Sequence, residues 1–127
     1  MPKILLIGYD VLVRKTLARL LKQAGHQVAE ARHRREAMAL ISTQRPDLVI
    51  VDMLLPEPDG HELVETILRC SPPLPLIAIT GTDRNESGAA LRLKGHKHAL
   101  AIQTFQMERL QEAIRCVAGA VGSAPAA

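Results

Sequence analysis

An unbroken apolar run from Leu48 to Val51 constrains the fold of this chain more than any other feature. Asp52 follows it directly, and a segment rich in turn-forming residues extends from Pro56 to Gly60. An apolar run bounded by turn signals is typical of a strand that is buried on both faces. A carboxylate at the end of such a strand lies where open parallel sheets place their ligands. Asp52 is therefore a candidate functional residue.

Five short apolar runs alternate along the chain with stretches of helical periodicity. We expect strands at 3–7, 27–30, 48–51, 76–80 and 99–103. A helical stretch follows each strand. The fourth of these stretches, at about 85–94, has the weakest helical pattern. Gly25 follows the first stretch, at the position of a left-handed cap. The alternation predicts an α/β fold with a three-layer, doubly wound, five-stranded parallel sheet. We expect one domain over residues 1–121 and a flexible tail or linker start over 122–127.

Composition limits the functional classes that the chain can belong to. The hydrophobic fraction is 47%, but only 2% of residues are aromatic, which argues against stacking of single-stranded bases. The net charge of +3 is spread along the chain, so direct nucleic-acid binding is not expected. No run approaches the ~20 apolar residues of a membrane span, and no signal peptide is visible. We therefore expect a cytoplasmic protein without membrane contact.

The loops lack the common catalytic and cofactor motifs. No dinucleotide fingerprint, phosphate-cradling loop, hydrolase elbow or zinc pattern is present, so we expect a protein that is not an enzyme. The basic run from Arg32 to Arg35 is most simply a solvated helix start, although a helix N-terminus prefers acids. Contact with an anion or a partner is the alternative for this run.

Four segments together resemble a bacterial response regulator receiver domain, over residues 3 to about 120. They are KILLIGYDVLVRKTLARLLKQAGHQVAEA, RPDLVIVDMLLPEPDGHELVETIL, LPLIAITG and FQMERLQEAI. The second is the most specific, because an Asp closes a hydrophobic strand and is followed by Pro and then Asp-Gly. The resemblance implies a flavodoxin-like fold with strand order 2-1-3-4-5 and a role in a two-component phosphorelay.

The resemblance also implies a set of site residues. Asp52 would be the phosphoacceptor for a phosphoryl group from a histidine kinase, and the Thr80 hydroxyl would hydrogen-bond that group. In the family, Mg²⁺ is held by two acids after the first strand, by the phosphorylated Asp, and by a backbone carbonyl that here belongs to Leu54. The metal offsets charge that gathers on the phosphoryl oxygens.

The chain departs from the family pattern at two positions. The acidic pair is replaced by Gly8 and Tyr9, and only the next residue, Asp10, offers a partial substitute. The Lys expected after the fifth strand aligns with Gln103, or with Ile102 by another count. Because Mg²⁺ is usually held by one or two carboxylates, we expect weak Mg²⁺ binding and weak or absent phosphorylation. A plain solvated carboxylate at Asp52 and a loop-capping hydroxyl at Thr80 remain open alternatives.

A second function is a pseudo-receiver that binds a protein partner independently of phosphorylation. In receivers, the fourth helix, fifth strand and fifth helix commonly form such a face. Its residues here would be Arg92, Lys94, Lys97, Ala99 and Arg109. A basic rim around small apolar residues suits an acidic signalling partner or a second copy in a homodimer, although a solvated charged face is the simpler interpretation. Binding of a small ligand ranks last, because no phosphate cradle is present.

Overall fold

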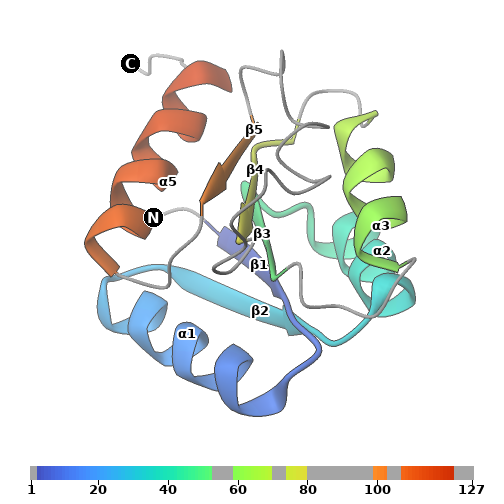
Figure 1. Cartoon of the computed structure of the whole chain (residues 1–127), viewed down its shortest axis with the longest axis horizontal. Coiled ribbons are helices and arrows are strands. Elements are labelled where there is room, and N and C mark those ends of the chain that lie inside the picture. Colours follow the sequence, from blue (N-terminus) through green and yellow to red (C-terminus); the bar gives the residue numbers. More distant parts are fainter. Residues whose placement is uncertain (1–2, 53–58, 70–73, 80–98, 103–106, 122–127) are drawn as a thin grey trace.

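The computed structural model describes residues 3–52, 59–69, 74–79, 99–102 and 107–121, and these form an α/β fold with helices on both sides of one sheet (Figure 1). The elements in chain order are β1 (Lys3–Ile7), α1 (Val11–Gln23), β2 (Gln27–Ala31), α2 (Arg34–Gln44), β3 (Leu48–Asp52), α3 (Asp59–Leu68), β4 (Leu76–Ile79), β5 (Ala99–Ile102) and α5 (Met107–Val121). The predicted alternation of strands and helices is confirmed wherever the chain is described.

The sheet has the strand order β2-β1-β3-β4-β5, and every neighbouring pair is parallel. This is the predicted doubly wound topology. The chain reverses its direction of travel across the sheet between β1 and β3, where Ile7 is in register with Val51. The carboxyl ends of these two strands therefore meet at the point where open α/β sheets bind ligands.

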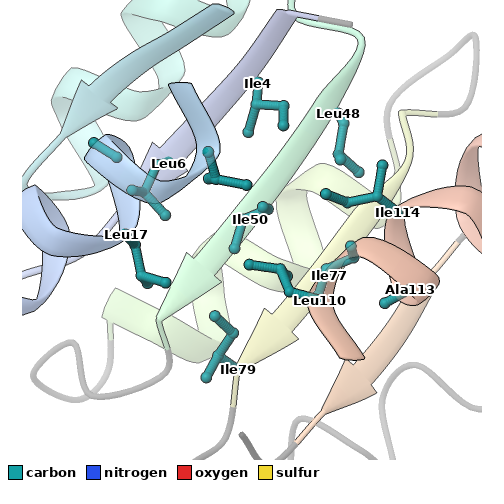
Figure 2. Packing of buried hydrophobic residues seen from close by; sticks show 12 residues of the cluster. Ile4, Leu6, Leu17, Leu48, Ile50, Ile77, Ile79, Leu110, Ala113 and Ile114 are labelled. Carbon is teal, nitrogen blue, oxygen red and sulfur yellow. The ribbon is translucent and has the colours of Figure 1, made fainter. Parts of the chain in front are cut away.

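Alternating residues of the buried strands supply two hydrophobic cores. On β3, Leu48 and Ile50 face α1 and α5, whereas Val49 and Val51 belong to the cluster that includes residues of α2 and α3. Figure 2 shows the first cluster, in which Leu17 of α1 and Leu110 of α5 approach the strands from the helical layer. Because both faces of β3 are buried, successive side chains from Leu48 to Val51 all lie in the core, which explains the unbroken apolar run.

The ends of the helices follow from residues near each terminus. The side chain of Asp10 accepts a hydrogen bond from the backbone of Val13 and caps α1, and Gly25 after that helix has φ of 100°, as predicted. At the start of α2, His33 accepts from the Glu36 amide, and Glu36 in turn accepts from the backbone of Arg32. The two hydrogen bonds form a reciprocal cap. In this cap Glu36 places a negative charge at a helix start whose neighbouring charged residues are basic.

Two strands end one residue later than predicted. The second strand extends to Ala31, and the third includes Asp52 itself. Thr80, Gln103, the predicted fourth helix at 85–94 and the tail at 122–127 lie outside the described residues. Within the part of the chain that is described, no helix combines the length and apolar character needed to cross a bilayer.

Candidate functional site

Asp52 and Gly8 lie side by side at the carboxyl edge of the sheet. Since Ile7 and Val51 are in register, the next residue on each chain is also adjacent, and both lie on the face covered by α1. A Cβ atom built on Gly8 would be 3.6 Å from the Cβ of Asp52. The Asp52 side chain is buried, at 2% exposure. The position that the resemblance aligns with a family acid therefore adjoins Asp52, and this chain has a glycine there.

The side chain of Arg14 packs against Gly8. Its Cβ would lie 3.5 Å from a Cβ on Gly8, and its Nη1 donates a buried hydrogen bond of 2.8 Å to the Gly8 carbonyl oxygen. Its Nε donates to Glu30 Oε1 at 3.0 Å, and Lys15 Nζ lies 3.2 Å from the same oxygen. Because Arg14 is only 6% exposed, its own contacts are made largely out of water, whereas the contact of Lys15 lies at the surface. They hold the loop after β1 against the end of β2.

Glu30 is the anion that balances Arg14. Burial by itself raises the pKa of the Glu30 carboxyl group, but hydrogen bonds from Arg14 and Lys15 and their positive charges together outweigh it and lower the pKa below the usual 4.5. Glu30 is on an edge strand whose register aligns it with Leu6, so its side chain faces α1. The carboxylate is therefore ionised at neutral pH.

Asp10 has a structural role in the described geometry. Its Oδ1 accepts from the Val13 amide at 3.0 Å, and its carbonyl accepts from the Arg14 amide at 3.0 Å. A carboxylate at a helix N-terminus is stabilised by the amides that lack partners there. Asp10 as a metal ligand stays a prediction, in competition with this cap.

Exposed side chains around the start of α1 are large and hydrophobic rather than acidic. Tyr9, Val11 and Leu12 are 61%, 58% and 76% exposed, respectively. By the resemblance, Tyr9 aligns with the second acid of the family's pair, and its side chain is exposed to solvent. This end of α1 therefore offers no carboxylate besides the one that caps the helix.

The described residues are a poor fit for a carboxylate-held Mg²⁺ ion. Asp52 supplies one buried carboxylate, Gly8 and Tyr9 supply none, and Asp10 caps α1. Among the residues that the structure describes, no group of three His, Cys, Asp or Glu side chains is suitably placed for a metal ion. The backbone carbonyl of Leu54 and the hydroxyl of Thr80 lie outside the described ranges.

The predicted interaction face is described only in part. Ala99 is half-buried on β5, which is an edge strand, and its neighbour Leu100 is 36% exposed. Arg109 is exposed on α5. The remaining predicted members, Arg92, Lys94 and Lys97, lie outside the described residues.

Sequence reasoning missed the pair formed by Arg14 and Glu30. A signal was present, because Arg14 occupies an inward position on α1 between Val13 and Leu17. A charged residue at a core spacing requires a partner. The sequence could not identify Glu30 as that partner, since the two are 16 residues apart and meet only after α1 packs on the sheet.

Comparison with known proteins identifies close similarity to one family. The family model for the response regulator receiver domain matches residues 4–115. The transcriptional regulatory protein AfsQ1 of Streptomyces coelicolor is 32% identical over 117 residues, covering 92% of this chain and 51% of that protein. The response regulator MprA of Mycolicibacterium vanbaalenii is 36% identical over 81 residues, covering 64% of this chain and 35% of that protein.

A solved structure shows the same likeness. The non-phosphorylated HemR receiver domain from Leptospira biflexa is 26% identical, with a TM-score of 0.79 and full coverage of both chains. The chain spans between about a third and a half of the two curated relatives named above. One of these is a transcriptional regulatory protein, so the comparisons do not support our expectation that direct nucleic-acid binding is unlikely.

Proposed function

Because the chain belongs to the family of response regulator receiver domains, modules of two-component signalling, we propose that it is a receiver whose phosphoacceptor position is Asp52 and whose phosphorylation is weak or absent. One observation carries the second part of this proposal. The space beside Asp52, at 3.6 Å from its Cβ, belongs to Gly8, so no carboxylate from that position can help to hold a metal.

The proposed reaction is phosphoryl transfer from a phosphohistidine of a kinase, or from a small phosphodonor. An oxygen of Asp52 attacks phosphorus, a new P–O bond forms, and the donor's bond to phosphorus breaks with its electron pair remaining on the donor. In the family, Mg²⁺ offsets the charge that develops on the phosphoryl oxygens. The described residues do not fit that ion, so this chain would carry out the transfer slowly.

The test restores the missing acids and asks whether Asp52 becomes reactive. A Cβ on Gly8 would make only ordinary contacts of 3.5 to 3.7 Å, and among the described glycines only Gly25 has positive φ, so Gly8→Asp is compatible with the backbone. The Gly8→Asp/Tyr9→Asp variant should accept phosphate from a small phosphodonor with Mg²⁺ at least about 100-fold faster than the parent chain. Intact mass spectrometry over a time course measures the rate.

Two control variants define the outcome. Adding Asp52→Asn to the restored variant should abolish the gain, and Leu12→Asp, which adds an acid at an exposed position of α1, should give none. Rapid phosphorylation of the parent chain would contradict weak phosphorylation. Phosphate that persists after Asp52→Asn would contradict the assignment of the phosphoacceptor.

A second candidate function is a phosphorylation-independent interaction through β5 and α5. It is favoured by Leu100, which is partly exposed on an edge strand, with Arg109 exposed on the following helix. If this face joins two copies, Leu100→Asp and Arg109→Glu should weaken self-association in sedimentation velocity, whereas Asp52→Asn should not. Arg19→Glu, an equal charge reversal on an exposed position of α1, is the control. An effect of Arg19→Glu as large as that of Arg109→Glu would argue against a specific face.

A further inference from the structure

A surface cavity of about 480 Å³, broadly open to solvent, lies along the outer edge of the sheet, away from the β5–α5 face. It is bounded by α1, by the edge strand β2 and by the start of α2. Its lining residues are Arg14, Lys15, Glu30, Arg32, Glu36, Ala39 and Leu40. The volume lies within the range of sites that accommodate small organic molecules.

The lining carries a net positive charge. Three cations face two carboxylates, and the pKa values of both Glu30 and Glu36 are lowered, so the two acids stay ionised at neutral pH. For Glu36 the main cause is the hydrogen bond from the Arg32 backbone. The cavity therefore has one positive charge in excess at neutral pH, which favours an anion.

Arg14 provides a built donor at the inner end of this cavity. Its Nε and Nη1 donate to Glu30 and Gly8, but no described residue accepts from Nη2. Arg14 is one of the residues that line the cavity, and Nη2 is its guanidinium nitrogen without a described partner.

The two cations at the rim can be recruited to a ligand at little cost. Lys15 is 59% exposed and pairs with Glu30, and Arg32 is 61% exposed and pairs with Glu36 at 3.3 Å. Ion pairs at such exposed positions contribute little to stability. Both side chains can therefore turn toward a bound anion, whereas Arg14 is already held in place by its two partners.

We infer that this cavity binds a small molecule that carries one oxyanion group, a carboxylate or a phosphate, and an apolar part. The oxyanion is bound by Arg14, Lys15 and Arg32, and the apolar part packs on Ala39 and Leu40. The basic start of α2, for which the sequence leaves an anion contact open, then has a specific role. Asp52 does not line this cavity, and the proposed binding does not depend on phosphorylation.

Titrations followed by ¹H–¹⁵N NMR, with phenyl phosphate and with inorganic phosphate as probes, test this inference. Both should cause saturable shifts of the Lys15, Arg32 and Leu40 amides. Phenyl phosphate should bind at least about threefold more tightly than inorganic phosphate, because its ring packs on Ala39 and Leu40. Arg32→Gln should weaken phenyl phosphate binding by about threefold to tenfold, as expected for loss of one charge-assisted hydrogen bond at a partly exposed position.

The matched control is Arg19→Gln, which removes the same charge from an exposed position of α1 outside the cavity. Arg19→Gln should leave the affinity for phenyl phosphate unchanged. If Arg19→Gln and Arg32→Gln weaken binding equally, the cause is the change in net charge and the inference is overturned. Shifts that stay linear with probe concentration would also overturn it. In the Asp52→Asn variant binding should persist; if it is lost, the probe occupies the phosphoacceptor site and the cavity is not the site.

Discussion

The ion pair of Arg14 and Glu30 provides the sharpest test of the energetics at this end of the fold. Breaking a buried pair by removing one partner leaves an uncompensated charge and costs about 3–5 kcal/mol. Here Lys15 also contacts Glu30, and the Glu30 side chain is 19% exposed, so the lower end of that range applies. We expect Arg14→Met and Glu30→Leu each to lower the free energy of unfolding by about 3 kcal/mol.

The double variant should cost far less than the sum of the two single changes. With both charges gone, the remaining penalty is the Gly8 carbonyl, which loses its donor at a cost of about 1–3 kcal/mol. The coupling energy should therefore be at least about 2 kcal/mol. Urea unfolding of the parent chain, both single variants and the double variant at pH 7 measures it. Lys15→Met, which removes the exposed partner of the same carboxylate, should cost under about 1 kcal/mol.

The same pair predicts how stability depends on pH. The pKa of Glu30 is lower in the folded chain than its usual 4.5, so the pair stabilises the fold fully above that value. The stabilisation is lost as the pH falls through the lowered pKa. The Glu30→Leu variant should therefore show a shallower loss of stability on acidification than the parent chain. Additive single changes within about 0.5 kcal/mol, or an unchanged acid slope, would refute this reasoning.

Two further predictions concern the ends of helices. Asp10→Ala should lower the unfolding free energy by about 1 kcal/mol through loss of the α1 cap, and Asp10→Asn should retain most of it; equal urea midpoints for Asp10→Ala and the parent chain would contradict the cap. Arg45→Gly should raise the unfolding free energy by about 0.5–1 kcal/mol, because Arg45 has φ of 47° after α2. Arg45→Ala, which keeps a Cβ in that conformation, should give no gain, and a gain equal to that of Arg45→Gly would indicate a side-chain effect instead.

Much of the fold could be predicted because each local signal here agrees with the tertiary arrangement. The apolar run at Leu48–Val51 requires burial on both faces, and a parallel sheet with two helical layers satisfies that requirement. The Gly after α1 marks a left-handed residue, and the structure has Gly25 at φ of 100°. The ends of β2 and β3 were each predicted one residue short, because tertiary pairing sets them: Ala31 pairs with Ile7 of β1, and Asp52 pairs with Ile79 of β4.

Some features of the candidate site could be predicted from the sequence, and others could not. Alternation along a strand is a property that a sequence pattern carries, so the sequence could predict Asp52 at the carboxyl edge. The resemblance to receiver domains, and not the pattern, implied that Gly8 takes the place of an acid. It could not predict that Asp10 would cap α1, because a carboxylate beside a helix start can serve either the helix or a metal.

By itself, then, the sequence determined the order of elements, the two-sided burial of β3 and the position of Asp52 at its end. The tertiary structure alone decided that Arg14 would pair with Glu30, that the Gly8 carbonyl would accept from the same guanidinium, and that a cavity would open along β2. The physical reason is the distance along the chain over which each kind of interaction acts. Periodicity and caps act within a few residues, whereas a buried charge is matched to its partner only when separate elements pack together and exclude water.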